Sequence, residues 1–222
     1  MILTIDGPAG AGKSSVTRKL AERLGFRFLD TGAMYRAVTW AAIKAETDFK
    51  DEPSLVKLME SLDLQLSDDA VVVNGVDVTH KIRQREVTLK VSAIADSIPI
   101  RQHLVELQRR LAATGDYVCE GRDQGTVVFP DAVCKIFLTA SPEQRAQRRM
   151  DQLSAEGQFV DYDQILREQA IRDRQDESRP FGALARADDA IEVNTDHKTM
   201  DEVVGELEQI AREKLAAAQH DA

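Results

Sequence analysis

Apolar residues recur along the chain in an alternation of short strand-like runs and helical stretches. Residues 2–5 form an apolar run rich in β-branched side chains, which predicts a central strand covered on both faces. Over residues 13–24 the apolar positions recur at helical spacing, and Gly25 ends the predicted helix. A strand over residues 26–29 and a second helix follow. This strand, helix, strand, helix order predicts a parallel sheet.

Between about residues 48 and 85 this alternation is interrupted. Residues 54–62 have the pattern of a short amphipathic helix, and residues 71–78 contain two β-branched runs separated by Asn74-Gly75. An Asn-Gly pair between such runs is a strong signal for a hairpin. We therefore expect a small antiparallel β insertion here, in place of a continuation of the parallel sheet.

The core pattern returns in the second half of the chain. Residues 116–120 and 133–140 predict two buried strands, and ligands collect at the carboxyl ends of such strands in doubly wound sheets. Ser141 is expected to cap the helix that follows the second strand. A helix over residues 165–179, a short strand over residues 190–193 and a C-terminal helix complete the prediction.

Composition limits the classes of function. The chain has 222 residues, of which 43% are hydrophobic, enough for one α/β domain with an insertion. Its formal net charge of −9 indicates no nucleic-acid or anionic membrane partner. No apolar stretch approaches the roughly 18 residues that span a bilayer. Cys119 and Cys134 lack zinc-type spacing and are expected to be reduced thiols, so we expect a cytoplasmic protein. We also expect a monomer.

A glycine-rich phosphate-binding motif directly follows the first predicted strand. Gly7-x-x-x-x-Gly12-Lys13-Ser14 fits the phosphate-loop template in its strand-then-helix context. Glycines let successive backbone N–H groups turn toward phosphate oxygens, and the helix dipole favours the same charge. Lys13 would reach the β/γ-phosphates and Ser14 would bind Mg²⁺. The predicted nucleoside triphosphate site comprises Gly7, Pro8, Ala9, Gly10, Ala11, Gly12, Lys13, Ser14 and Ser15.

The strand over residues 116–120 ends in a charged cluster, Glu120-Gly121-Arg122-Asp123. With the strings GPAGAGKSS, DTGAMYR, GRDQGTVVFPDA, KIFLTAS and RDRQD, in that order, the chain resembles the bacterial cytidylate kinase family over essentially its whole length. The resemblance implies a P-loop NTPase-type three-layer α/β fold with a parallel central sheet in a single domain, residues 1–222. Its core would be residues 1–47 and 86–222. The β insertion over about residues 48–85 would be the monophosphate-binding lobe, and about residues 151–164 a short lid.

The same resemblance implies the reaction. ATP would transfer its γ-phosphoryl group to CMP or dCMP, giving ADP and CDP or dCDP, with Mg²⁺ as cofactor, in pyrimidine nucleotide metabolism. The acceptor phosphate is largely ionised at pH 7, because the second pKa of a phosphate monoester is near 6. No general base is then required. The site must instead hold two polyanions in line and spread the charge of the transition state.

The resemblance also implies roles for particular residues. The expected catalytic residues are Lys13, Arg122 and Arg179. The acceptor phosphate would be held by Arg36, Arg122 and Arg179 with the Thr31 hydroxyl, the cytosine edge by Ser92, Arg101 and Asp123, and the ribose by Arg172 and Asp176. From the residues alone, an exposed helix face with i, i+4 ion pairs explains Arg172, Asp176 and Arg179 better, and only the resemblance favours the functional roles. Arg148 or Arg149 would close over ATP, although these residues and Arg145 also fit an ordinary charged helix.

Two segments depart from the family pattern. Residues 182–184 read Gly-Ala-Leu where Ala-Pro-Leu is usual, and residues 194–196 read Asn-Thr-Asp where Asp-Thr-Ser is usual. Both are expected nearer the adenine side, which leaves the donor base open. A GTP-binding switch protein would carry an Asn-Lys-x-Asp string, which the sequence lacks. A P-loop kinase with an alcohol acceptor would need a base, and stands only if Arg36 and Arg122 do not face the loop.

Overall fold

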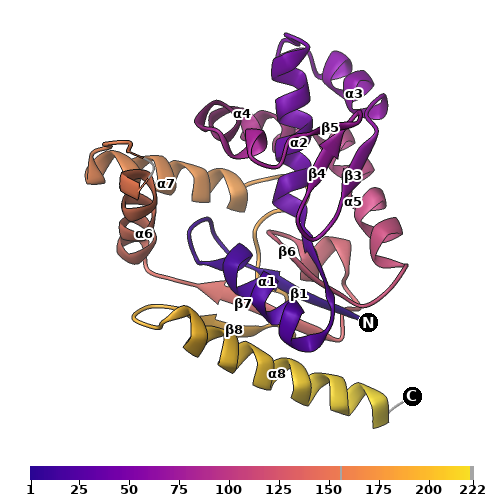
Figure 1. Cartoon of the computed structure of the whole chain (residues 1–222), viewed down its shortest axis with the longest axis vertical. Helices are drawn as coiled ribbons and strands as arrows, with labels where there is room; N and C mark the ends of the chain where they lie inside the picture. Colours follow the sequence, from indigo (N-terminus) through magenta and orange to yellow (C-terminus); the bar gives the residue numbers. More distant parts are fainter. Residues whose placement is uncertain (156, 221–222) are drawn as a thin grey trace. The chain divides into compact units, whose positions relative to one another are not determined.

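The computed structural model describes residues 1–155 and 157–220 (Figure 1). The chain divides into two compact units. The first comprises residues 1–26 with residues 116–222, and the second comprises residues 27–115. The second unit therefore contains the segment expected as a β insertion together with the helices that flank it.

The central sheet is parallel, which confirms the predicted α/β class. Its strands follow the order β2-β6-β1-β7-β8. They are β1 (Ile2–Asp6), β2 (Arg27–Asp30), β6 (Tyr117–Gly121), β7 (Cys134–Thr139) and β8 (Ile191–Asn194). Strand β1 lies between β6 and β7, so it is buried along almost its whole length. In this register Asp6 stands opposite Gly121, so β1 and β6 end side by side.

The helices of the first unit form two packed pairs. They are α1 (Lys13–Leu24), α6 (Pro142–Ala155), α7 (Tyr162–Glu177) and α8 (Met200–His220). Helix α1 packs against α8, which runs along β7, and α6 packs against α7 (Figure 1). The Ser141 hydroxyl accepts the Gln144 N–H at 3.3 Å, which confirms the expected cap of α6. In the expected lid, residue 156 lies outside the described residues.

The second unit combines helices with a small antiparallel sheet. Its elements are β2, α2 (Thr31–Lys44), α3 (Glu52–Glu60), β3 (Leu64–Leu66), β4 (Val71–Val73), β5 (Val76–Asp77), a 3₁₀ turn (Lys81–Arg83), α4 (Arg85–Asp96) and α5 (Ile98–Ala112). Strands β4 and β5 form the predicted hairpin, with Val73 opposite Val76. Asn74 and Gly75 both have positive φ there, at 50° and 76°. Strand β3 pairs with β4 and was not predicted.

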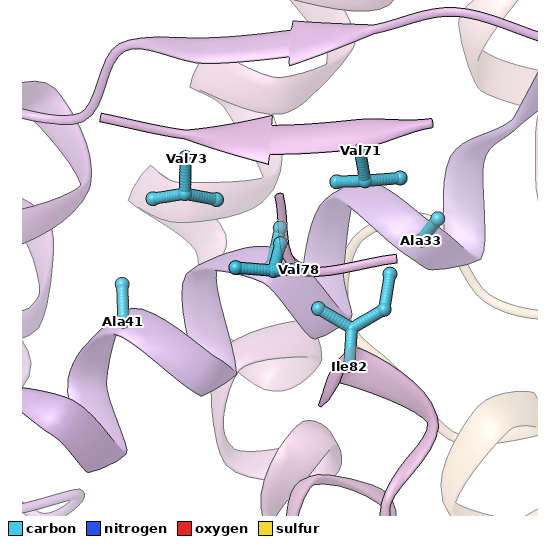
Figure 2. Close-up of a cluster of buried hydrophobic side chains, with 7 residues drawn as sticks. Ala33, Ala41, Val71, Val73, Val78 and Ile82 are labelled. Carbon is cyan, nitrogen blue, oxygen red and sulfur yellow. The ribbon is translucent and has the colours of Figure 1, made fainter. Parts of the chain in front are cut away.

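One apolar cluster joins the small sheet to α2 (Figure 2). Val71 and Val73 of β4 point toward Val78 and Ile82, and alanines of α2 complete the cluster. Because alanine side chains are short, the sheet approaches the helix backbone closely. The hairpin signal in the sequence is therefore accompanied by a buried face that stabilises it.

Cys119 and Cys134 are buried free thiols, as expected. Burial raises the pKa of the Cys134 thiol to about 11, so it stays protonated near neutral pH. Among the helices that the structure describes, none combines the length and the apolar composition needed to cross a membrane.

Candidate active site

The phosphate loop connects β1 to α1 and has the backbone that its glycines permit. Gly7, Gly10 and Gly12 have φ values of 146°, 82° and 93°. A Cβ atom on Gly7 would lie 2.1 Å from the backbone oxygen of Leu138, which cannot move aside without distorting β7. The glycine at this position is thus required both by its φ value and by the close approach of β7.

Lys13 is folded back onto the loop. Its Nζ donates hydrogen bonds to the carbonyl oxygens of Gly7 and Pro8, each at 2.7 Å. The residue is only 5% exposed. Burial and the neighbouring Arg122 charge lower the pKa of Lys13 to about 7, against the opposite effects of Glu120 and Asp6. The ammonium group is therefore held at the loop by carbonyl oxygens that an anionic ligand can replace.

Ser14 and Glu120 offer oxygen atoms beside the loop. The Ser14 hydroxyl donates a hydrogen bond to the Glu120 carboxylate, which lies near the end of β6. Mg²⁺ prefers hard oxygen ligands and keeps several waters when it binds with phosphates. A hydroxyl and a carboxylate fit that chemistry. Within the described part of the chain there is no group of three or more His, Cys, Asp or Glu side chains that could hold a metal ion.

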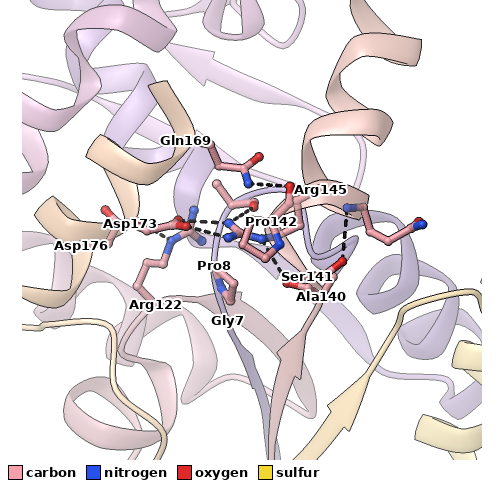
Figure 3. A network of polar contacts seen from close by, with 12 residues as sticks. Gly7, Pro8, Arg122, Ala140, Ser141, Pro142, Arg145, Gln169, Asp173 and Asp176 are labelled. Atoms are coloured by element: carbon pink, nitrogen blue, oxygen red, sulfur yellow. Dashed lines mark hydrogen bonds and ion pairs between the residues drawn. The ribbon is translucent and has the colours of Figure 1, made fainter. Parts of the chain in front are cut away.

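Arg122 and Arg179 both contact the Asp176 carboxylate, and Figure 3 shows Arg122 beside Asp176. Arg122 Nε donates to Asp176 Oδ2 at 2.8 Å, and Arg179 Nη2 lies 2.6 Å from Asp176 Oδ1. Burial alone would raise the pKa of Asp176, but the charges of Arg122 and Arg179 outweigh it and hold the pKa below its ordinary value. Of the expected acceptor residues, the structure thus brings together one that follows β6 and two at the end of α7.

Two more expected residues of the first unit, Asp123 and Arg172, lie close in sequence to Arg122 and Asp176. Asp123 is buried, and its backbone carbonyl accepts N–H groups of Val127 and Val128. Arg172 lies on α7, and its charge contributes to the pKa of both Lys13 and Asp176. These electrostatic effects link the end of α7 to the phosphate loop.

Arg145 of α6 contacts the phosphate loop. The sequence did not decide between such a role and an ordinary charged helix for this residue. Its Nη1 donates to the Ala9 carbonyl at 3.0 Å, and its two terminal nitrogens bind the Asp173 carboxylate at 3.1 and 2.7 Å (Figure 3). Helices α6 and α7 and the phosphate loop are therefore joined by one buried guanidinium group. No spacing in the sequence indicates the Arg145–Asp173 pair, because the two residues lie 28 positions apart.

Arg148 and Arg149 differ in their surroundings. Arg148 donates to the Gly10 carbonyl at 3.4 Å and to the hydroxyl and carbonyl oxygens of Thr195 at 3.0 and 2.7 Å. Arg149 donates to Gln152 within its own exposed turn. Of these two arginines, Arg148 is the one that contacts the phosphate loop. Thr195 belongs to the segment that departs from the family pattern.

Two expected phosphate-binding residues lie on α2 in the second unit. Asp30 caps this helix, because its carboxylate accepts the Ala33 N–H at 2.9 Å. Thr31 is the first helical residue and is buried. Arg36 lies five residues further along, and its Nη1 donates to the Thr88 hydroxyl of α4 at 2.8 Å. The Asp30 cap thus fixes the start of α2 and, with it, the positions of Thr31 and Arg36 along the helix.

The expected base-reading residues Ser92 and Arg101 lie on α4 and α5. Arg101 is buried, donates to the Ala95 carbonyl at 2.9 Å and stands 5.3 Å from the centre of the Tyr35 ring. Ser92 is half-buried on α4. Helices α2, α4 and α5 pack against one another, so these four expected residues lie on three mutually packed helices.

Comparisons with known proteins agree on one family. A family profile described as cytidylate kinase matches residues 3–213. A cytidylate kinase of Rhodopirellula baltica is 49% identical over 218 residues, which cover 98% of this chain and 95% of the relative. A bifunctional pantoate ligase/cytidylate kinase of Thermosynechococcus vestitus is 46% identical over 221 residues, and the match covers 96% of this chain but 43% of that longer protein.

One solved structure shows the same fold at low identity. A gluconokinase from Sinorhizobium meliloti 1021 superposes with a TM-score of 0.50 at 17% identity, covering 99% of this chain and 97% of that one. Identity at that level is evidence for the fold alone. Family membership rests on the profile match over nearly the whole chain and on the curated relatives. The chain belongs to the cytidylate kinase family.

Proposed function

We propose that the protein transfers the γ-phosphoryl group of ATP to CMP or dCMP, giving ADP and CDP or dCDP, in pyrimidine nucleotide metabolism. One observation carries this proposal most directly. Arg122 and Arg179 are gathered at Asp176 in the same compact unit as the phosphate loop. Paired guanidinium groups have the fork geometry that binds a phosphate dianion, so a second phosphate site next to a phosphate loop fits a monophosphate acceptor.

On the donor side, residues 7–15 would bind ATP. Lys13 would leave the carbonyl oxygens of Gly7 and Pro8 and bind the β/γ-phosphates. The Ser14 hydroxyl, with the Glu120 carboxylate beside it, would hold Mg²⁺. When bound, Mg²⁺ neutralises phosphate charge in such reactions. Arg148, which already contacts the loop carbonyl of Gly10, would close over the bound ATP.

On the acceptor side, the proposal assigns each expected residue a contact. Thr31, Arg36, Arg122 and Arg179 would hold the phosphate, and Arg172 and Asp176 the ribose. Ser92, Arg101 and Asp123 would read the base. A carboxylate such as Asp123 accepts from the 4-amino group of cytosine, whereas uracil presents a carbonyl there and would face it acceptor to acceptor.

We infer further that the protein works as a single-domain, cytoplasmic monomer. The buried free thiols Cys119 and Cys134 fit a reducing compartment. The segment over residues 48–85 is proposed as the monophosphate-binding lobe and residues 151–164 as the lid. Closure of both would exclude water, which would otherwise accept the phosphoryl group.

Arg122→Ala tests the acceptor site. A charge-assisted contact is worth about 1.5–3 kcal/mol, so kcat/KM for CMP should fall at least about tenfold. Arg174→Ala removes an exposed arginine of α7 and serves as the matched control, with kcat/KM expected to change less than about twofold. A change below twofold for Arg122→Ala would remove Arg122 from the site and contradict the assignment.

A further inference from the structure

Asp6 is a buried carboxylate at the end of β1, immediately before the phosphate loop. Its Oδ1 accepts the Gln124 N–H at 2.9 Å, and its Oδ2 accepts the Gly125 N–H at 2.7 Å. These two N–H groups belong to the turn that follows Arg122 and Asp123. One side chain therefore joins the strand that leads into the donor site to the turn that carries two expected acceptor residues.

A buried carboxylate is a costly way to satisfy two backbone groups. Burial raises the pKa of Asp6 to about 6, the Asp123 charge adds to that effect, and the two backbone hydrogen bonds and Lys13 oppose it. An ionised carboxylate accepts at both oxygens. An asparagine would accept at one atom only and would turn an NH₂ group toward the other backbone N–H. Aspartate therefore fixes both backbone N–H groups of this turn, which asparagine cannot do.

The turn itself has little freedom to move. Residues 124–128 form a π-helical turn in which Phe129 N–H donates to the Gln124 carbonyl at 2.7 Å. A Cβ on Gly125 would lie 3.0 Å from Thr4 Oγ1 and 3.2 Å from Lys135 Cδ. The turn thus lies directly against β1 and β7, and the position of its backbone is set by Asp6 on one side and by these two strands on the other.

We propose that Asp6 is a positioning residue for the phosphoryl acceptor: by holding the backbone of residues 124 and 125, it keeps the Arg122 guanidinium in place beside the phosphate loop. Asp6 touches no substrate in this account and acts through Arg122. The inference rests on the proposed function, because it takes Arg122 as a ligand of the acceptor phosphate.

Asp6→Asn separates this role from a structural one. We expect KM for CMP to rise and kcat/KM for CMP to fall at least about tenfold, which corresponds to about 1.4 kcal/mol. The Kd for ATP, measured by calorimetry, should stay within about threefold of wild type, because Arg122 serves the acceptor. Asp201→Asn is the control, since Asp201 is an exposed carboxylate paired with the exposed Lys19, and should leave both constants unchanged.

Arg122→Ala and the double variant Asp6→Asn/Arg122→Ala complete a double-mutant cycle, which measures the coupling between Asp6 and Arg122 in kcat/KM for CMP. If Asp6 acts through Arg122, adding Asp6→Asn to Arg122→Ala should lower kcat/KM for CMP by less than about twofold more. Full additivity of the two losses overturns the inference, as does an Asp6→Asn variant whose main defect is a weakened Kd for ATP. Impaired Arg122→Ala with unimpaired Asp6→Asn overturns the inference and leaves the proposed function standing. Unimpaired Arg122→Ala overturns the inference and removes Arg122 from the proposed acceptor site, and the acceptor assay decides separately whether the protein phosphorylates CMP.

Gly125→Ala provides a second variant that displaces the same turn from its other side. Its Cβ would press on Thr4 and Lys135, so we expect the same selective rise in KM for CMP. This variant keeps Asp6 intact and applies the test even if Asp6→Asn does not fold. A folded Gly125→Ala protein with unchanged KM for CMP would contradict the claim that the position of this turn governs acceptor binding.

Discussion

Replacing Asp176 by asparagine removes a negative charge that Arg122 and Arg179 share. The carboxylate side chain is 3% exposed and lies 2.8 Å from Arg122 Nε and 2.6 Å from Arg179 Nη2. Breaking a buried ion pair from one side costs about 3–5 kcal/mol, because the remaining charge stays buried without its partner. Asparagine keeps one oxygen acceptor, so the lower end of that range, about 3 kcal/mol, is expected for Asp176→Asn.

Thermal unfolding measures this loss. For a chain of this length each kcal/mol shifts Tm by about 2–4 °C, so Asp176→Asn should lower Tm by about 6–12 °C without substrate at pH 7. Glu177→Gln changes the exposed neighbouring carboxylate on the same helix and should shift Tm by less than about 2 °C. A shift for Asp176→Asn no larger than that of Glu177→Gln would refute the claim that Asp176 holds the two guanidinium groups together.

The pH dependence of the free energy of unfolding tests the same ion pairs independently. The pKa of Asp176 is lower in the folded protein than its ordinary value of 3.8. Its contribution is therefore present above pH 3.8 and is lost as the pH falls through the lower, folded-state pKa. The stability difference between wild type and Asp176→Asn should stay constant from neutral pH down to about pH 4 and shrink below it. A difference that grows on acidification would contradict the assignment.

Three further predictions follow from individual contacts. Lys13→Ala should abolish phosphoryl transfer in a coupled assay while circular dichroism shows an intact fold, and wild-type turnover would contradict the assigned site. Gly7→Ala should destabilise the protein by about 1–3 kcal/mol and weaken ATP binding, because its Cβ meets the Leu138 carbonyl, whereas Gly205→Ala, with open space around it, should do neither. The pKa of Asp6 is raised from 3.8 to about 6, so folding favours the protonated form. In urea titrations the free energy of unfolding of wild type should therefore fall relative to Asp6→Asn by about 3 kcal/mol between about pH 4 and pH 7. A rise over that pH range would contradict the prediction.

Local signals in the sequence sufficed for the elements whose cause is local. The phosphate loop was predictable because positive φ values at Gly7, Gly10 and Gly12 need glycine whatever surrounds them. The Asn74-Gly75 hairpin was predictable for the same reason. Strand β3 was missed, since three residues of mixed polarity carry little periodic signal and are ordered by pairing with β4.

The missed parts of the candidate site depend on contacts between distant residues. Asp6 meets the backbone of Gln124 and Gly125 across more than a hundred positions. Backbone N–H groups have no identity in a sequence, so nothing in the residue pattern indicates that contact. Arg145 looked like one of several arginines on a charged helix, and only the fold shows that it is buried against Ala9. The residue types thus predicted which chemical groups the site contains, and the fold determines which of these groups contact one another.

The acceptor specificity tests the central claim most directly. Purified protein is incubated with ATP, Mg²⁺ and, in separate reactions, CMP, dCMP, UMP, AMP or GMP, and ADP formation is followed together with the nucleoside diphosphate product. The account predicts rapid conversion of CMP and dCMP to their diphosphates with matching ADP release, and slower reaction with the other three. Activity confined to AMP or GMP, or ADP release without a nucleoside diphosphate product, would contradict it.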